Sequence, residues 1–204
     1  MEEKLKELLL QRKRRVVFDG HLKHSAVLIP LFIKDGEHHI LFIKRSQEVE
    51  NHKGEISFPG GLCEKSDGGP EETALREAFE ETGIRSQDVK VLGTLDDMKT
   101  ISTNYRVTPI AGVIPYPYSF TLQKAEVDEI IEIPLTYLLD EGNGLEESIT
   151  REGKTYTGCV YHYKDYLIWG ATARILSNLF AIMIDLKDSC TRSSQSKPRS
   201  DLDC

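Results

Sequence analysis

A short acidic helix set among strand-like segments is the feature that most limits the folds open to this chain. The helix is predicted for Glu71 to Thr82, because Pro70 suits its first turn and Gly83 its C-terminal end. Segments rich in Val, Ile and Leu precede and follow it, and a second amphipathic helix is predicted for 170–186. This order predicts a mixed α/β domain in which helices pack on a sheet.

The strand predictions begin with a hairpin formed by 25–33 and 39–44 around an Asp35-Gly36 turn. Pro109 interrupts the strand predicted for 106–114 and indicates a sheet edge or a bulge. The remaining predicted elements are a short helix over 2–14 and strands over 55–58, 89–95, 129–133, 156–163 and 166–169.

The chain length of 204 residues suits one domain with a full-sized core. We divide the chain into a helical lead-in over 1–20, the folded domain over 21–187, and a tail over 188–204. The tail has too little apolar surface to offset its ordering entropy and is predicted to be disordered.

The bulk composition excludes several classes of protein. A net charge of −7 argues against a nucleic-acid-binding protein. No apolar stretch suits a membrane span, and the charged N-terminus does not look like a secretory signal, so we expect a cytoplasmic protein. The four scattered cysteines do not suggest a zinc site or structural disulfides.

The predicted acidic helix places three carboxylates on one face. With Glu77 at zero, Glu81 lies about 40° to one side and Glu80 about 60° to the other. The residues expected to pack on the sheet are Leu75, Ala78, Phe79 and Thr82. Like charges at these spacings repel, so a hard divalent cation such as Mg²⁺ or Mn²⁺ is a natural partner.

A solvated acidic face is the alternative interpretation, and for an isolated Glu-x-x-Glu-Glu it is the commoner one. The flanking residues favour a metal site. Arg76 adjoins the carboxylates, the turn Phe58-Pro59-Gly60-Gly61 precedes them, and Asp67 lies in the intervening loop. Glycines in such a turn allow the backbone to come close to a metal or a phosphate.

These residues resemble the signature of the Nudix hydrolases, which ends in Arg-Glu-apolar-x-Glu-Glu-x-Gly-apolar, here Arg76 to Ile84. The loop between Asp67 and Arg76 is one residue longer than the common pattern, as in the coenzyme A diphosphatase branch. The segment Leu41 to Ser46, with Gly54 and the glycine turn, is similar to the upstream signature of that branch. Ile43 and Glu50 depart from it, standing where the branch prefers Thr and Arg. Segments 26–30, 104–109 and 166–173 extend the resemblance over roughly 24–186.

The resemblance implies a Nudix-like α/β/α sandwich with a mixed sheet, and a set of functional residues. Glu77 and Glu81 are implied metal ligands, and Glu80 is either a further ligand or the group that takes a proton from the attacking water. Arg76 is implied to pair with one of these acids and hold the loop, and a carbonyl of Gly60 or Gly61 to complete the metal shell. Glu126 best matches a remote catalytic acid, with Asp128 and Glu129 as alternatives and a solvated loop acid as the simpler explanation.

Basic residues before the acidic helix are candidates for binding substrate phosphates, including the 3′-phosphate of coenzyme A. They are Lys44, Arg45, His52 and Lys53, and a solvated basic stretch is the alternative for each of them. Tyr105 or Trp169 can stack on an adenine, although either residue is more often part of a core.

The implied activity is metal-dependent hydrolysis of a nucleoside diphosphate linked to another group, above all coenzyme A or its derivatives, giving 3′,5′-ADP and 4′-phosphopantetheine. Alternatives are a Nudix hydrolase acting on ADP-ribose, dinucleotide polyphosphates or oxidised nucleotides, and a non-catalytic nucleotide-binding regulator. A structural module would explain neither the glycine turn nor Arg76. The expected partner is a small nucleotide diphosphate, with no nucleic acid or membrane. The sequence is compatible with a homodimer but leaves the oligomeric state open.

Overall fold

The computed structural model describes residues 1–49, 52–100, 104–140, 142–151 and 153–194. Its helices are α1 (Glu2–Gln11), α2 (Pro70–Thr82), α3 (Leu135–Leu139) and α4 (Gly170–Ser194), with a 3₁₀ turn at Ser86–Asp88. The larger sheet contains β1 (Lys23–Lys34), β2 (Glu37–Arg45), β3 (Ile56–Ser57), β4 (Gly60–Leu62), β5 (Lys90–Thr94), β6 (Met98–Lys99), β7 (Tyr105–Val113) and β8 (Val127–Pro134). A second sheet contains β9 (Gly144–Arg151), β10 (Lys154–Tyr163) and β11 (Tyr166–Ile168).

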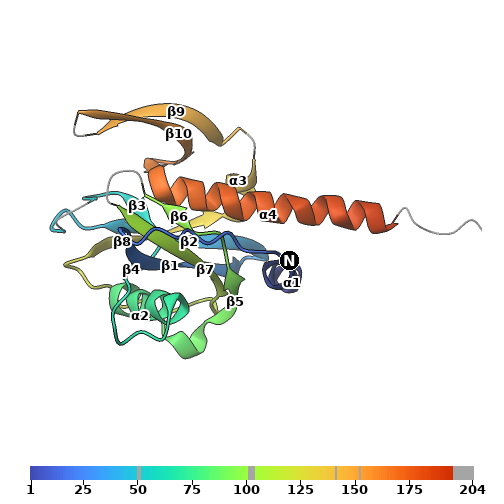
Figure 1. Cartoon of the computed structure of the whole chain (residues 1–204), viewed down its shortest axis with the longest axis horizontal. Coiled ribbons are helices and arrows are strands. Elements are labelled where there is room, and N and C mark those ends of the chain that lie inside the picture. Colours follow the sequence, from blue (N-terminus) through green and yellow to red (C-terminus); the bar gives the residue numbers. More distant parts are fainter. Residues whose placement is uncertain (50–51, 101–103, 141, 152, 195–204) are drawn as a thin grey trace, which may run out of the picture.

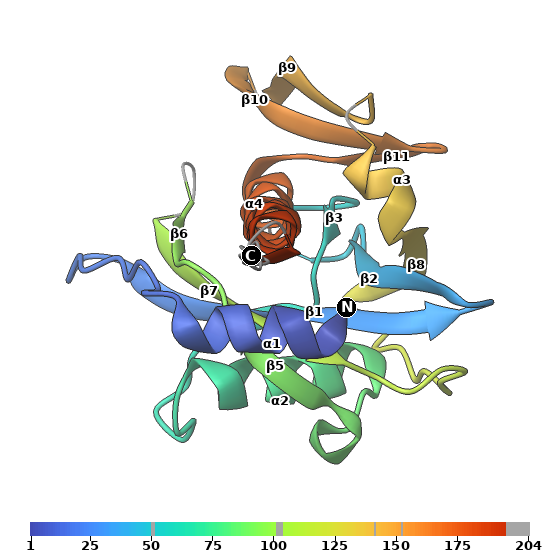
Figure 2. The same cartoon turned by 90° about the vertical axis from the view of Figure 1, so that its right-hand side faces the viewer.

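The larger sheet is mixed, because β1 runs parallel to β7 while its pairings with β2 and β4 are antiparallel. Helix α2 covers one face of this sheet, and α1 and α4 cover the other (Figure 1, Figure 2). Successive residues of a strand point to opposite faces, so β1 contributes to both cores. Leu28 and Phe32 pack on the α2 side, and Ile29 and Leu31 on the α4 side. The predicted α/β/α sandwich is therefore confirmed.

The predicted hairpin at residues 25–44 is present, with Leu31 opposite Ile40, but the interpretation of Pro109 as an edge residue is wrong. Strand β7 lies inside the sheet, between β1 and β5. The sheet tolerates this proline because the β5 ladder ends at Ile110 and the β6 ladder begins at Val107. Pro109 thus lies between two short partner strands, and its carbonyl accepts the N–H of Leu95 at 2.9 Å.

The C-terminal helix α4 continues past the boundary predicted at residue 187 and reaches Ser194. The residues between 187 and 194 include neither proline nor glycine, so nothing in the local sequence ends the helix earlier. Residues 195–204 of the predicted tail lie outside the described part of the chain. No helix among the described residues is long and apolar enough to span a bilayer.

Candidate active site

The acidic helix α2 packs closely against β4, and two glycines shape this region: Gly60 lets β4 approach β1, and Gly61 leaves room for α2. A Cβ on Gly60 would lie 2.3 Å from the carbonyl oxygen of Ala26, at a backbone φ of +155° that side chains rarely adopt. A Cβ on Gly61 would lie 2.4 Å from the Glu77 carboxylate. The glycine turn therefore admits the Glu77 carboxylate to a space that any larger residue would fill.

The side of α2 that packs on the sheet agrees with the predicted one at Ala78 and Thr82, which are buried, and differs from it at Phe79 and Glu81. Glu81 is only 1% exposed, while Phe79, which was expected to pack on the sheet, is 53% exposed. The small side chains of Ala74 and Ala78 are fully buried and bring the helix in on the side that carries Glu81. The face of α2 that bears the acids thus overlaps its packing face, and Glu81 is held at the boundary between helix and sheet.

Burial controls the electrostatics of these acids. Desolvation raises the pKa of Glu81 to about 8, opposed by the Gly60 N–H, which donates to Glu81 Oε2 at 2.8 Å, and by the charge of Arg45. Desolvation also raises the pKa of Glu77, which the Arg76 charge opposes. Glu77 and Glu126 also raise the pKa of Glu81, and Glu80 and Glu126 raise that of Glu77, so the cluster attracts a cation.

Arg76 is fixed by the loop that precedes the helix. Its Nε and Nη2 donate to the two carboxylate oxygens of Asp67 at 3.0 and 3.1 Å, and Nη2 also donates to the Leu62 carbonyl. The guanidinium and the Thr73 hydroxyl hold the pKa of Asp67 well below its usual range. The loop acid therefore orients Arg76, whose Nη1 then contacts Glu77 at 3.0 Å and Glu80 at 3.2 Å.

The two remaining candidate acids are exposed to solvent. The Glu80 side chain is 55% exposed and contacts Arg76. Glu126 is exposed just before β8, and its backbone carbonyl accepts the N–H of Ser46, the residue after Arg45, at 2.8 Å. Its charge raises the pKa of both Glu77 and Glu81. Of the alternatives to it, Asp128 is exposed and Glu129 accepts a hydrogen bond from the Tyr166 hydroxyl at 2.7 Å.

Two of the basic candidates, Lys44 and Arg45, are adjacent residues of β2 and point to opposite faces of it. Arg45 lies next to the acids, with Nη1 3.7 Å from Glu81 Oε1, and its buried Nε has no hydrogen-bond partner among the described residues. Lys44, the preceding residue of the strand, lines a separate small pocket with Glu129 and Tyr166. Lys53 is exposed. Glu50 lies outside the described residues.

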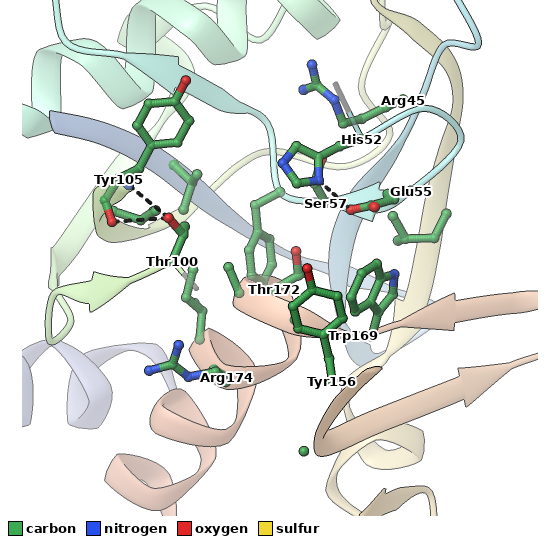
Figure 3. Close-up of a pocket in the computed structure, with 18 of the residues that line it drawn as sticks. Arg45, His52, Glu55, Ser57, Thr100, Tyr105, Tyr156, Trp169, Thr172 and Arg174 are labelled. Atoms are coloured by element: carbon green, nitrogen blue, oxygen red, sulfur yellow. Dashed lines mark hydrogen bonds and ion pairs between the residues drawn. The ribbon is translucent and has the colours of Figure 1, made fainter. Parts of the chain in front are cut away.

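A pocket of about 580 Å³ adjoins the acids on the other side of the glycine turn (Figure 3). Its walls come from the larger sheet, the second sheet and the start of α4. Arg45, His52, Gly60, Gly61, Tyr105 and Trp169 line it, together with residues of the second sheet such as Glu147, Ile149 and Tyr156. The Trp169 ring is tilted against the Tyr156 ring, with centroids 5.7 Å apart. The glycine turn is thus shared by the acid cluster and the cavity.

The glycine turn, the clamped arginine and the acids all fall within residues 22–147, which match the family model of the NUDIX domain. The chain belongs to the Nudix family. It is 38% identical over 157 residues to the uncharacterized Nudix hydrolase NudL of Photorhabdus laumondii, covering 77% of this chain and 83% of that protein. It is 34% identical over 165 residues to NudL of Escherichia coli strain K12, covering 81% and 84%. This Nudix protein is therefore a hydrolase that acts on phosphoanhydride bonds.

Solved structures agree on the fold of this Nudix hydrolase. A MutT/nudix family protein from Enterococcus faecalis matches with a TM-score of 0.56 at 15% identity, covering 86% of this chain and 66% of that one. At this identity the likeness concerns the fold alone. The mixed sheet and the helices on its two faces are therefore those of the Nudix fold.

The acid cluster of this Nudix hydrolase is suited to a divalent cation, which its family typically uses. Among the described residues, no three His, Cys, Asp or Glu side chains are already gathered around a common point, and Arg76 Nη1 bridges Glu77 and Glu80. The donors are carboxylate oxygens, which Mg²⁺ and Mn²⁺ prefer, and the absence of a side chain on Gly61 makes room for the Glu77 carboxylate. The donor set therefore fits such an ion.

Several residues around the pocket were not identified from the sequence. Strand β9 was not predicted because its residues alternate weakly between apolar and polar. Ser57, Thr172 and Arg174 line the pocket from β3 and α4. The one feature of the sequence that could have indicated them is that they lie in or next to segments 56–61 and 166–173. A serine or threonine by itself says little about binding.

Proposed function

We propose that this Nudix hydrolase cleaves the diphosphate of coenzyme A or its derivatives, giving 3′,5′-ADP and 4′-phosphopantetheine. The proposal is supported by the longer loop between Asp67 and Arg76 and by the upstream signature around Arg45. The observation that carries it is the position of Arg45, beside Glu81 and on the wall of the large pocket. A signature residue therefore adjoins both the acids and the space available for substrate.

We assign the divalent cation to Glu77 and Glu81, with Glu80 beside them. Mg²⁺ or Mn²⁺ bound there would neutralise charge on the diphosphate and lower the pKa of water. The buried Glu81 carboxylate is then ionised because the cation offsets its desolvation. Asp67 holds Arg76, and Arg76 in turn orients Glu77 and Glu80.

The remaining roles follow from exposure and distance. Glu126 is exposed and close enough to the cluster to affect the pKa of its acids, so we propose it as the acceptor of the proton from the attacking water, with Glu80 as the alternative acceptor. Arg45 binds a phosphate oxygen, while Gly60 and Gly61 allow the diphosphate to approach the backbone. Lys44 and Lys53 remain predicted phosphate contacts from outside the large pocket.

The test is hydrolysis of coenzyme A, ADP-ribose and diadenosine polyphosphates with Mg²⁺, Mn²⁺ or a chelator, followed by chromatographic separation of the products. We expect metal-dependent release of 3′,5′-ADP and 4′-phosphopantetheine from coenzyme A. Cleavage of ADP-ribose or a dinucleotide polyphosphate with coenzyme A left intact would overturn the proposal. A Glu50→Arg variant, which restores the residue preferred by the branch, then measures how much this position affects KM.

A further inference from the structure

Helix α4 begins at the wall of the large pocket. Trp169, Gly170, Ala171 and Thr172 all line this cavity, and the helix continues for 25 residues to Ser194. The first N–H groups of a helix have no partner within it, and Trp169, at the capping position, has no side-chain acceptor for them. A Cβ built on Gly170 would meet no atom within 4 Å. The first turn of α4, which carries the positive end of the helix dipole, therefore borders open space at the pocket wall.

The hydroxyl of Thr172 is a second, independent sign of a ligand at this place. The residue is only 9% exposed, and among the described residues its side chain has no hydrogen-bond partner. Figure 3 places this hydroxyl toward the interior of the pocket. An unpaired hydroxyl that faces a cavity can donate a hydrogen bond to a ligand bound there.

Two residues that line the same cavity carry further unpaired donors. The buried Oγ of Ser57, on β3, and the buried Nε of Arg45 have no hydrogen-bond partner among the described residues. Arg174, one turn into α4, also lines the pocket, and its Nη1 donates to the Lys99 carbonyl at 2.8 Å. The unpaired groups are donors or hydroxyls, which suits an acceptor-rich ligand.

Carboxylates that line the pocket would repel an acceptor-rich ligand unless their charge is offset. Glu55 contacts the His52 ring at 2.9 Å, and Glu147 contacts the His162 ring at 2.9 Å. Each carboxylate therefore has an imidazole partner. The acids of α2 are separated from the cavity by Gly60 and Gly61, which themselves line it.

We propose that the N-terminus of α4, together with Thr172 and Ser57, is a second anion site that binds a phosphate group of the substrate other than the diphosphate that is cleaved. Phosphate is the ligand class because helix N–H groups and hydroxyls offer it several hydrogen bonds at once. This inference rests on the proposed function, in which the group is the 3′-phosphate of coenzyme A. The site would make the enzyme specific for 3′-phosphorylated nucleotides.

Binding measurements test the site without catalysis. Isothermal titration calorimetry compares 3′,5′-ADP with 5′-AMP on the wild type, on Thr172→Val, which keeps the shape, and on Thr172→Ser, which keeps the hydroxyl. We expect the wild type to prefer 3′,5′-ADP by about tenfold or more, Thr172→Val to lose most of this preference, and Thr172→Ser to keep it. Equal affinity of the wild type for both nucleotides, or an equal loss for both in Thr172→Val, would overturn the proposal.

Kinetics separate this inference from the proposed function. With coenzyme A and dephospho-coenzyme A as substrates, Thr172→Val should raise KM about tenfold for coenzyme A alone and leave kcat within about twofold. A rise in KM that is the same for both substrates contradicts the anion site, even if coenzyme A is hydrolysed. If neither compound is cleaved, the proposed function fails, and the calorimetry alone still decides whether the anion site exists.

Discussion

The two sides of the glycine turn Phe58–Gly61 differ in how their polar groups are partnered. On the α2 side, Arg76 donates to Asp67, Glu77, Glu80 and a carbonyl. On the pocket side, the described residues leave Arg45 Nε and Ser57 Oγ buried without partners. Groups satisfied by the protein hold a geometry, whereas buried groups left unsatisfied are available to a ligand. The acid side, which is the α2 side of the turn, is therefore held by contacts within the protein, and we propose that substrate completes the pocket side.

The largest expected effect tests the acid side. Glu81→Gln should reduce kcat by roughly a thousandfold, because it removes the buried charge that we assign to the cation. Its thermal stability should be unchanged or higher, since a neutral amide avoids the desolvation cost of the carboxylate. Steady-state assays under saturating Mg²⁺ measure this, with Glu71→Gln, at an exposed glutamate in the first turn of α2, as the matched control. Turnover at the wild-type rate would refute the assignment of Glu81 as a ligand.

The second test uses pH and a chelator to remove the cation from the acid side. Because the pKa of Glu81 is about 8 in the folded chain against 4.5 ordinarily, the folded state binds more protons between these values. The metal-free protein should therefore lose stability as pH rises from 5 to 8.5, by roughly 2–4 kcal/mol. Urea unfolding in EDTA measures the loss, and Glu81→Gln should largely abolish it. An identical pH profile in the two proteins would argue against the buried carboxylate as its cause.

A substitution at Arg76 tests whether its position matters in addition to its charge. Arg76→Lys keeps the charge but cannot make the bidentate hydrogen bonds to the Asp67 carboxylate. We therefore expect kcat and metal affinity to fall by about 10–100-fold. The matched control is Arg85→Lys, because Arg85 is an exposed arginine that pairs with Asp88. If both variants retain full activity, the Asp67–Arg76 pair does not support the site.

The smallest expected effect lies on the pocket side. Arg45→Lys should raise KM by about tenfold with little change in kcat, because Arg45 contacts substrate phosphate while the acids stay in place. Lys44→Met serves as the comparison, since Lys44 lines a different pocket. A larger loss for Lys44→Met than for Arg45→Lys would reverse the roles of the two faces of β2.

Much of the fold could be predicted from the sequence because its signals are local. The turn at Asp35–Gly36 and the start and end of α2 at Pro70 and Gly83 depend on backbone preferences of single residues. The interior position of Pro109 could not be predicted, because it depends on the lengths of β5 and β6, which come from elsewhere in the chain.

The candidate site was predictable to the extent that helical spacing fixes it. The spacing of Glu77, Glu80 and Glu81 placed them on one face, but it could not indicate that Glu81 would be buried. Burial depends on how closely α2 approaches β4, which Gly61 and the alanines of the helix decide together. Thr172 was not found because its significance lies in a missing partner, which only the packed structure reveals.

The second sheet is contiguous in the chain, from Gly144 to Ile168, and each of its strands pairs with its sequence neighbour. It supplies Glu147, Ile149 and Tyr156 to the pocket, but the acids assigned to the cation all come from α2. The family match ends at residue 147, near the start of this segment. Tyr161 and Ile168 anchor this segment in the main core, whereas residues such as Glu147 and Ile149 lie outside that core and can change without disturbing it. Evolution and protein engineering can therefore change what this scaffold accepts while its hydrolytic machinery is inherited intact.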